Sequence, residues 1–270
     1  MRLAVQYPSQ FFFAASFKPE FVADLACHGF LPTALELEGT PRAICLLPKL
    51  HKKRCLLFYE DLHVSRSSRK HSRKFTVTVD QCFDECVNNC IEQHGENWLY
   101  PPLVAAFRHL FRTGGIRSVH FAMHSIECWQ DGKLAAGEIG YSVGAVYTSL
   151  SGFTKVNSAG TSQLLATSSL LYLNEFEFWD LGMILEYKSN LGAKAYSRKS
   201  FLTQLYRART KSCRLQCAAA RNARDIIDEA RAKWSSPSIP AQANESAFQS
   251  EETKELDSDS MTRKRKAPKQ

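Results

Sequence analysis

Residues 124–153, HSIECWQDGKLAAGEIGYSVGAVYTSLSGF, carry the pattern that decides the fold of this chain. An Asp131-Gly132 step separates two runs with the composition of β-strands, which is a strong local signal for a hairpin at residues 130–133. The second strand contains Gly137 and Gly140, and glycine inside a strand often marks a close approach to the backbone. We therefore expect antiparallel strands with a bare patch for a ligand.

The composition is that of an ordinary globular protein, with 270 residues, 44% hydrophobic and 23% charged. The net charge of +8 and the pI near 9.0 favour an anionic partner such as nucleic acid. The nine cysteines have irregular spacings, and we find neither a signal peptide nor an apolar run of about 18 residues. These features predict a cytoplasmic protein with no membrane span, and we expect a monomer.

Three regions differ in pattern along the chain. Residues 1–62 combine a short helix with short strands between prolines and glycines, which predicts a small N-terminal lobe. Residues 63–233 alternate strand and helix patterns and end in a long basic helix or helix pair. Residues 234–270 have few large apolar side chains, so we expect a disordered tail. Its basic run at 263–266 is either a nuclear address or a solvated group of charges.

One predicted helix has cysteine or histidine at every fourth position: Cys82, Cys86, Cys90 and His94. Positions four apart on a straight helix are separated by a rise of about 6 Å, so one ion can bind two neighbours but not all four. Free cysteine commonly packs as a small hydrophobic side chain. We therefore expect core packing here and no metal centre.

Basic side chains are dense between residues 51 and 74, where eight Lys or Arg face two acids. A solvated surface explains such a run, whereas clustered cations interleaved with hydroxyls also suit a phosphate backbone. Trp98 follows at a helix junction, where an aromatic ring either wedges the packing or stacks on a base. Nucleic-acid binding and simple solvation both remain open from these residues alone.

The element order from residue 75 is strand, two helices, several antiparallel strands, helix, strand and short helix. This order predicts an α+β protein with a GNAT-like acyltransferase fold, in which a mixed, mainly antiparallel sheet flanked by helices splits to admit the acyl donor. The loop at residues 156–162 lacks the Arg/Gln-x-x-Gly-x-Gly/Ala pattern that holds acetyl-CoA. We therefore expect no bound cofactor.

The chain resembles the leucyl/phenylalanyl-tRNA-protein transferases over roughly residues 11–205. The resemblance rests on an ordered series of short stretches: Gly29-Phe-Leu-Pro32, Leu62-His-Val-Ser-Arg66-Ser67, Trp98, His124-Ser-Ile-Glu127-Cys-Trp129, Ser151-Gly-Phe153, Asn157-Ser-Ala159, Asp180 and Ser189-Asn-Leu-Gly192-Ala193. It implies an enzyme that moves an amino acid of the leucine or phenylalanine type from aminoacyl-tRNA to the N-terminus of an acceptor protein, which marks that protein for degradation.

The resemblance also implies roles for particular residues. Basic residues where the family holds the acceptor stem of the tRNA are His63, Arg66, Arg69, Lys70, Arg73 and Lys74, with Trp98 expected to stack near the terminal adenosine. Residues along the aminoacyl pocket are Tyr147, Ser149, Leu150, Gly152 and Phe153. Asp180 matches the catalytic-strand aspartate and is the first candidate for orienting or deprotonating the attacking amine.

The chain departs from the family at several of these positions. The family's Asp-Cys-Gln is Asp180-Leu181-Gly182 here, and Leu150 stands where a pocket glutamate is expected. Glu138 stands where the family has an apolar residue, so it is our second catalytic candidate and can replace the lost acid. A relative that binds tRNA without catalysis and an acyl-CoA N-acyltransferase are the alternative functions.

Overall fold

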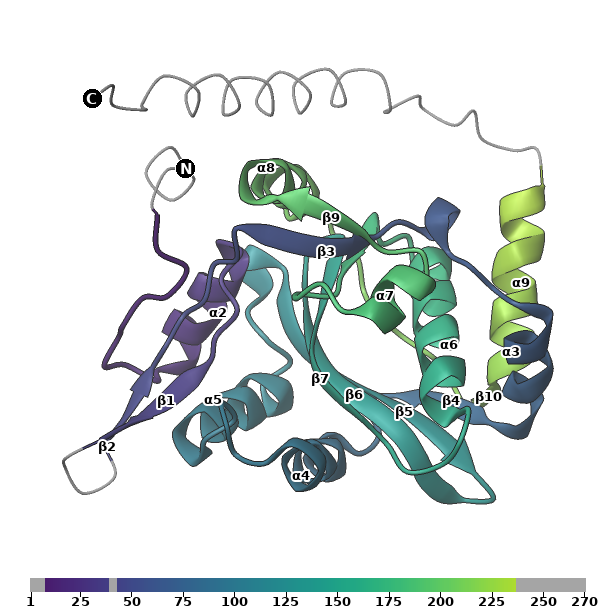
Figure 1. Cartoon of the computed structure of the whole chain (residues 1–270), viewed down its shortest axis with the longest axis horizontal. Coiled ribbons are helices and arrows are strands. Elements are labelled where there is room, and N and C mark those ends of the chain that lie inside the picture. The colour runs from purple at the N-terminus through teal and green to yellow at the C-terminus, as the bar shows by residue number, and fades with distance from the viewer. Residues whose placement is uncertain (1–7, 39–42, 237–270) are drawn as a thin grey trace, which may run out of the picture. The chain divides into compact units, whose positions relative to one another are not determined.

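The computed structural model describes residues 8–38 and 43–236 (Figure 1). The described residues up to Ala232 form one compact unit, and a second unit begins at Lys233. We expected a disordered tail from residue 234, but the last helix continues to Ser235. The basic run at 263–266 lies outside the described residues. In the described ranges, no helix combines the length and apolar character required to cross a bilayer.

The described residues form an eight-stranded sheet with the order β10-β4-β5-β6-β7-β8-β3-β9. The strands are β3 (Lys53–Leu57), β4 (Thr76–Val79), β5 (Phe121–Gln130), β6 (Lys133–Val143), β7 (Val146–Thr154), β8 (Phe178–Asp180), β9 (Lys194–Ser197) and β10 (Arg221–Asn222). Strands β7 and β8 pair in parallel, and the other pairs are antiparallel. The predicted mixed, mainly antiparallel sheet is confirmed.

The predicted hairpin joins β5 to β6. Asp131 and Gly132 have φ of 50° and 72°, as a two-residue turn between twisted strands requires. Farther along, the register between β6 and β7 shifts after Ile139, where Leu150 becomes an extra residue on β7. Such a bulge changes which side chains face each side of the strand.

The sheet opens between β7 and β8. The pairing covers only Val146–Thr148 on β7 and Phe178–Asp180 on β8, although β7 continues to Thr154. Strand β8 stops at Asp180 because Gly182 turns the chain with a φ of 71°. The strand that we expected between the last helix of the series and the short helix therefore has only three residues in the structure. An opening between neighbouring strands is the feature expected of the GNAT-like fold.

Helices cover both faces of the sheet (Figure 1). The helices are α2 (Pro19–Cys27), α3 (Arg66–His71), α4 (Phe83–His94), α5 (Pro101–Arg112), α6 (Ala159–Leu173), α7 (Glu186–Asn190), α8 (Arg198–Ala208) and α9 (Ala223–Ser235), with short 3-10 turns at Tyr59–Asp61, Ser72–Lys74 and Arg117–Val119. One apolar core lies between the sheet and α6, and another lies under α2, α4 and α5. We call these sides the α6 face and the α4–α5 face.

The described strands of residues 1–62 are divided between a small sheet and the large one. A two-stranded sheet, β1 (Ala34–Leu37) with β2 (Ala43–Leu46), matches the expected short strands. Strand β3, however, lies inside the large sheet between β8 and β9. Its residues from Arg54 to Leu57 are buried, so the sheet needs them to complete its core. Of the long basic helix or helix pair that we expected, the structure has the pair, α8 and α9.

Candidate active site

Alternation along β7 divides the predicted pocket residues between the two faces of the sheet. Tyr147 is buried in the core of the α6 face. Phe153 is buried in the other core, and Leu150 packs against that core. Because Leu150 is the bulged residue, Ser149 and Gly152 both face Glu138 across the β6–β7 ladder. The structure thus gathers Tyr147, Ser149 and Gly152, but not Leu150 or Phe153, around Glu138.

Glu138 is a buried carboxylate near the middle of β6, and only 3% of the residue is exposed. Its Oε2 accepts a hydrogen bond from the hydroxyl of Ser149 at 2.9 Å. Burial raises the pKa of Glu138 to about 7. The neighbouring groups that limit this rise are Ser149, Tyr147, Gln163 and the charge of Lys188. A carboxyl group of this kind changes its protonation state near neutral pH.

Two polar atoms in this cluster interact with each other but form no hydrogen bond of normal geometry with a described residue. They are Oε1 of Glu138 and the hydroxyl oxygen of Tyr147, and both are buried. Burial, followed by the charge of Glu138, raises the pKa of Tyr147 well above its ordinary value, so its hydroxyl keeps its proton. Unsatisfied buried polar groups are rare and require an explanation. An acceptor and a donor together suit a small polar group of a substrate.

A short chain of hydrogen bonds links this cluster to β8. Trp179 donates from Nε1 to the hydroxyl oxygen of Ser149 at 2.8 Å, and Ser149 donates in turn to Glu138. Ser149 therefore fixes one oxygen of the carboxylate relative to the strand on the far side of the opening. Trp179 is buried, and its ring centroid lies 6.4 Å from that of Tyr147. The sequence pattern did not identify Trp179 as a site residue.

Two further elements place polar groups near Glu138 that the sequence analysis missed. Helix α6 turns polar side chains inward, among them Gln163, whose Nε2 donates to the hydroxyl of Thr167 at 2.8 Å. Helix α7 contributes Lys188, whose Nζ donates to the carbonyl oxygens of Leu181 and Met183 at 2.5 and 3.1 Å. Burial lowers the pKa of Lys188. Polar residues within an otherwise apolar helix were the available signal for Gln163.

The glycines of β6 have a different use from the one we expected. A Cβ on Gly137 would lie 3.0 Å from the ring of Phe153, and one on Gly140 would lie 2.5 Å from the hydroxyl of Tyr147. These two glycines therefore make room for aromatic side chains of β7. Gly152, in contrast, is exposed, and it lies opposite Glu138. The bare patch of this sheet is at Gly152.

Asp180 is part of a buried ion pair on the other face of the sheet. Nη2 of Arg54 donates to Oδ2 at 2.7 Å, and Nε donates to Oδ1 and Oδ2 at 2.8 and 3.0 Å. The N–H of Gly182 and the hydroxyl of Thr148 also donate to this carboxylate, at 2.9 and 3.2 Å. Burial alone would lower the pKa of Arg54, but the carboxylate outweighs it and leaves that pKa raised. Both residues are fully buried, and this ion pair engages the carboxylate that we named as the first candidate for orienting or deprotonating the amine.

His124 lies in another buried network, on β5. Its Nδ1 is 2.9 Å from Oδ2 of Asp80, and its Nε2 is 3.0 Å from the hydroxyl oxygen of Ser142. Ser142 is buried within the central strand β6, and the hydrogen bonds of this network already engage both ring nitrogens of His124. The network holds the residue that follows β4 against β5.

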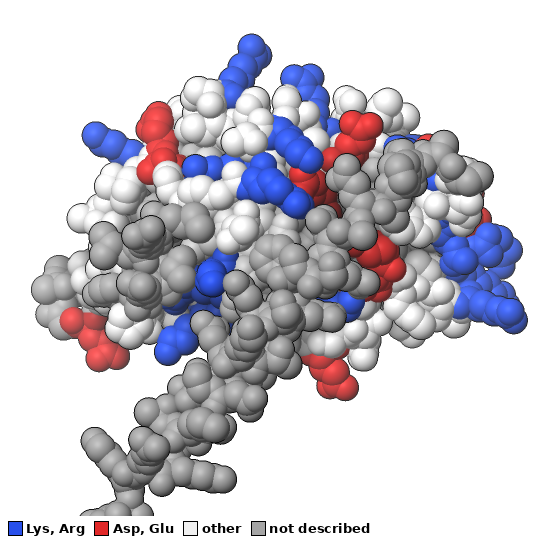
Figure 2. Space-filling view, turned by 90° about the horizontal axis from the view of Figure 1, so that it is seen from above, with Lys and Arg blue, Asp and Glu red and all other residues white. Residues whose placement is uncertain are grey.

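The basic segment forms helix α3 and the 3-10 turn after it. Ser65 caps α3 by accepting from the backbone N–H of Ser68 at 3.0 Å. The exposed members of the predicted tRNA-binding set are His63, Arg66, Lys70, Arg73 and Lys74. Arg69 is half-buried and donates to both carboxylate oxygens of Asp228 on α9. Blue side chains gather at the side of the molecule where α3 and α9 lie (Figure 2).

Trp98 is not part of this basic surface. It is half-buried and packs against the core of the α4–α5 face, whereas α3 contacts α6. The predicted tRNA-binding residues therefore come from two different parts of the fold.

Comparison with known proteins agrees with the resemblance. A sequence model described as leucyl/phenylalanyl-tRNA protein transferase matches residues 56–206. A protein of this name from Desulfatibacillum aliphaticivorans is 32% identical over 70% of this chain and 78% of its own length. Those from Pectobacterium carotovorum and Zymomonas mobilis are 30% and 31% identical, and the chain spans 63% and 57% of their lengths.

A solved structure, the C-terminal domain (DUF2156) of a putative lysylphosphatidylglycerol synthetase from Agrobacterium fabrum, is 12% identical over 71% of this chain and 59% of that one. Its TM-score of 0.33 is too low to support an argument. The sequence matches alone identify the family. The expected aminoacyltransferase class is thereby confirmed, and this chain belongs to the leucyl/phenylalanyl-tRNA protein transferase family.

Proposed function

We propose that this chain transfers an amino acid from an aminoacyl-tRNA to the N-terminal amine of an acceptor protein, and that Glu138 binds and deprotonates the attacking amine. Family membership supports the reaction. The observation that carries the role of Glu138 is its buried Oε1, which has no well-formed hydrogen bond and lies beside the hydroxyl of Tyr147. An ammonium group is a suitable partner for such an acceptor.

The reaction needs little beyond placement and proton transfer. The amine nitrogen attacks the ester carbonyl, a C–N bond forms, and the C–O bond to the ribose breaks. The amine must first lose a proton, and an α-amino group has a pKa of about 8. The pKa of Glu138, raised to about 7 by burial, is close to this value, so the proton can pass to the carboxylate at little cost. After the attack the nitrogen loses a second proton, which passes to the ribose oxygen as the tRNA leaves, and Glu138 returns its own proton to solvent.

Tyr147 is a candidate for stabilising the negative charge that develops on the carbonyl oxygen. Its buried hydroxyl is a donor beside Glu138, and a preorganised donor in a dry site is effective for this purpose. The rings of Tyr147 and Trp179 are buried beside this cluster, so a leucine- or phenylalanine-type side chain would have to enter between β7 and β8 to contact them. The substrates approach past Gly152, since this exposed glycine lies opposite Glu138.

The remaining predicted residues take supporting roles in this proposal. Asp180 is a positioning residue, because its ion pair with Arg54 fixes β8 next to β3 and with it the neighbouring Trp179. The exposed cations of α3 and the turn after it bind tRNA phosphates. A single chain supplies all these residues, so the proposal is for a monomer. The nine free cysteines fit a reducing cytoplasm, where the modified acceptor is marked for degradation.

The test is transfer of label. The protein is incubated with tRNAs charged with different radiolabelled amino acids and with peptides that differ in their N-terminal residue. We expect label on the peptide from at least one charged tRNA, and none when the peptide's N-terminus is acetylated, because an acetylated amine cannot attack. Label on the acetylated peptide would contradict an N-terminal acceptor.

A relative that binds tRNA without catalysis is the second candidate. This alternative is favoured by the burial of the Glu138 cluster, since only 3% of Glu138 is exposed. Such a protein would bind tRNA through the same cations but transfer no label from any charged tRNA. The two functions therefore separate in the same experiment.

A further inference from the structure

Two cysteines at the start of α4 meet a glutamate of β5 on the α4–α5 face of the sheet. The sulfur atoms of Cys82 and Cys86 and a carboxylate oxygen of Glu127 all lie within 4.8 Å of one another. The cysteines are one helical turn apart, and Glu127 comes from a strand more than 40 residues later. The spacing of the cysteines alone supplies two ligands, and the fold adds a third.

Glu127 is held in place for this role. The hydroxyls of Thr78 and Ser125 each donate to it at 2.5 Å, and the backbone N–H groups of Gln81 and Cys82 donate at 3.2 Å. Three of these bonds go to Oε1 and one to Oε2, so Oε2 keeps capacity for another partner. Hydrogen bonds of this kind orient a ligating carboxylate and fix its geometry.

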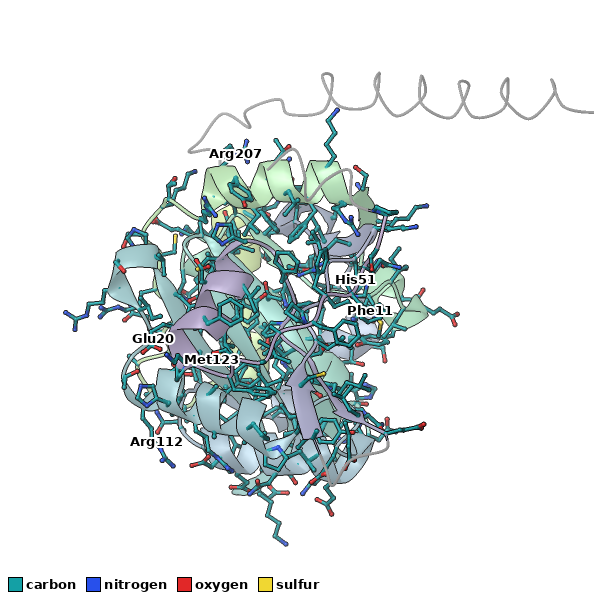
Figure 3. The ribbon with its side chains drawn as sticks, turned by 90° about the vertical axis from the view of Figure 1, so that its left-hand side faces the viewer. Phe11, Glu20, His51, Arg112, Met123 and Arg207 are labelled. Atoms are coloured by element: carbon teal, nitrogen blue, oxygen red, sulfur yellow. The ribbon has the colours of Figure 1, made fainter. Side chains whose placement is uncertain are left out.

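The cluster has an entry path from the surface and lies at the start of a helix. Cys82 is half-buried and lines a surface pocket of about 380 Å³ between the start of α4 and the end of α5. Arg112, at the rim of this pocket, projects from the surface (Figure 3). The cluster also lies at the N-terminus of α4, a helix of 12 residues, where the helix dipole favours negative charge such as thiolate.

We propose that Cys82, Cys86 and Glu127 bind one Zn²⁺ ion. Two sulfur ligands and one carboxylate suit a borderline-soft ion that prefers tetrahedral sites, and the pocket leaves the fourth position to water. On binding, each thiol releases its proton to solvent and each thiolate forms a bond to zinc, so up to two protons leave per ion. The ion would link the start of α4 to β5.

The site is separate from the proposed transfer reaction. Glu127 faces α4, whereas Glu138 faces α6. Metal binding and catalysis therefore fail or succeed independently, and the metal can be tested without an activity assay.

The experiment titrates the reduced full-length protein with Zn²⁺ and with Cd²⁺, whose thiolate bonds give an ultraviolet charge-transfer band. We expect one tightly bound ion per chain and a melting temperature that rises with ion concentration. Cys82→Ser should weaken binding by about 100-fold or more, because even groups outside the ligand set contribute roughly 10- to 100-fold. Cys86→Ala should do the same.

The matched control variants replace one cysteine on the same helix and two cysteines in another part of the chain. Cys90→Ala removes a buried cysteine one turn beyond Cys86, and a Cys213→Ser, Cys217→Ser pair removes two half-buried ones. All should bind the ion like the unmodified chain. Absence of stoichiometric binding, or equal loss in Cys82→Ser and Cys90→Ala, would overturn the proposal. If Cys86→Ala does not fold, the Cys82→Ser variant tests the proposal by itself, because Cys82 is only half-buried.

Discussion

Nη2 of Arg54 lies 2.7 Å from Oδ2 of Asp180, and neither side chain is accessible to solvent. The pair joins β3 to β8 across residues that are 126 positions apart in the sequence. Both carboxylate oxygens of Asp180 accept hydrogen bonds from neighbouring groups of the fold, so the side chain has a structural role. We expect Asp180 to influence the reaction only indirectly, because it fixes the position of β8.

Removing one partner of this pair should destabilise the fold. Arg54→Met leaves the Asp180 carboxylate buried without its cation, and we expect a loss of about 3–5 kcal/mol in the free energy of unfolding. The double variant Arg54→Met, Asp180→Leu should recover much of this loss, because no buried charge remains. Urea unfolding followed by circular dichroism measures both. A single variant as stable as the unmodified chain would contradict the structural role.

The Asp180→Asn variant distinguishes a positioning role of Asp180 from a role as proton acceptor. If Asp180 only positions β8, transfer activity per folded molecule should fall modestly and its pH dependence should stay unchanged. A large loss of activity in fully folded protein, together with an altered pH profile, would restore Asp180 as the proton acceptor.

Glu138 should make stability depend on pH. Its pKa is about 7 in the folded chain, above the ordinary value of 4.5, so the folded state holds the extra proton between these values. The contribution of this group to the free energy of unfolding therefore has its full value below about pH 4.5. It is lost as pH rises through 7, by roughly 3 kcal/mol at most. Glu138→Gln should remove this decline. Parallel stability curves for the two proteins from pH 5 to 8 would show that the carboxyl is not perturbed.

The cations of α3 and the following turn should contribute to tRNA affinity. Lys70 and Lys74 are exposed, so replacing both with alanine should weaken binding without affecting the fold. For each tRNA phosphate that is no longer neutralised, the slope of log affinity against log salt should become shallower by about 0.7–0.9. Arg117→Ala, an exposed cation near the other end of β5, serves as the control. An equal effect in the control would indicate general electrostatics in place of a defined surface.

Gly152 should control access to Glu138. A Cβ at this position would lie 3.2 Å from the carbonyl oxygen of Gly137 and 3.4 Å from Cβ of Glu138. Gly152→Ala should therefore fold but raise the KM for the acceptor peptide at least several-fold. Gly160→Ala is a control with a similar fit, since its Cβ would lie 3.4 Å from Thr154. Unchanged kinetics in Gly152→Ala would place the approach elsewhere.

Local patterns predicted the parts of the fold that depend on neighbouring residues. The Asp131-Gly132 turn needs positive φ at both positions, and this requirement is visible in the sequence. The strand expected from residue 75 is β4, and its signal, the alternation of apolar and polar residues, is also local. By contrast, the place of β3 between β8 and β9 depends on pairing with residues more than 120 positions away, for which the local sequence holds no signal.

The sequence named several residues of this candidate cluster but did not indicate how they are arranged. Glu138 was singled out because an acid stands where an apolar residue was expected, and the structure buries it beside Tyr147 and Ser149. The bulge at Leu150, which decides which β7 residues share its face, has no clear mark in the sequence. Likewise, the pleat of β8 turns Trp179 toward Glu138 and Asp180 away from it.

The most direct test of the central claim compares transfer by the unmodified protein and by Glu138→Gln, using charged tRNA and a peptide with a free N-terminus. We expect labelled peptide from the unmodified protein, with a rate that rises through about pH 7 as Glu138 ionises. Glu138→Gln should bind tRNA normally yet transfer roughly 100-fold more slowly or worse. Equal transfer rates in the two proteins, or tRNA binding without transfer from any charged tRNA, would contradict the account.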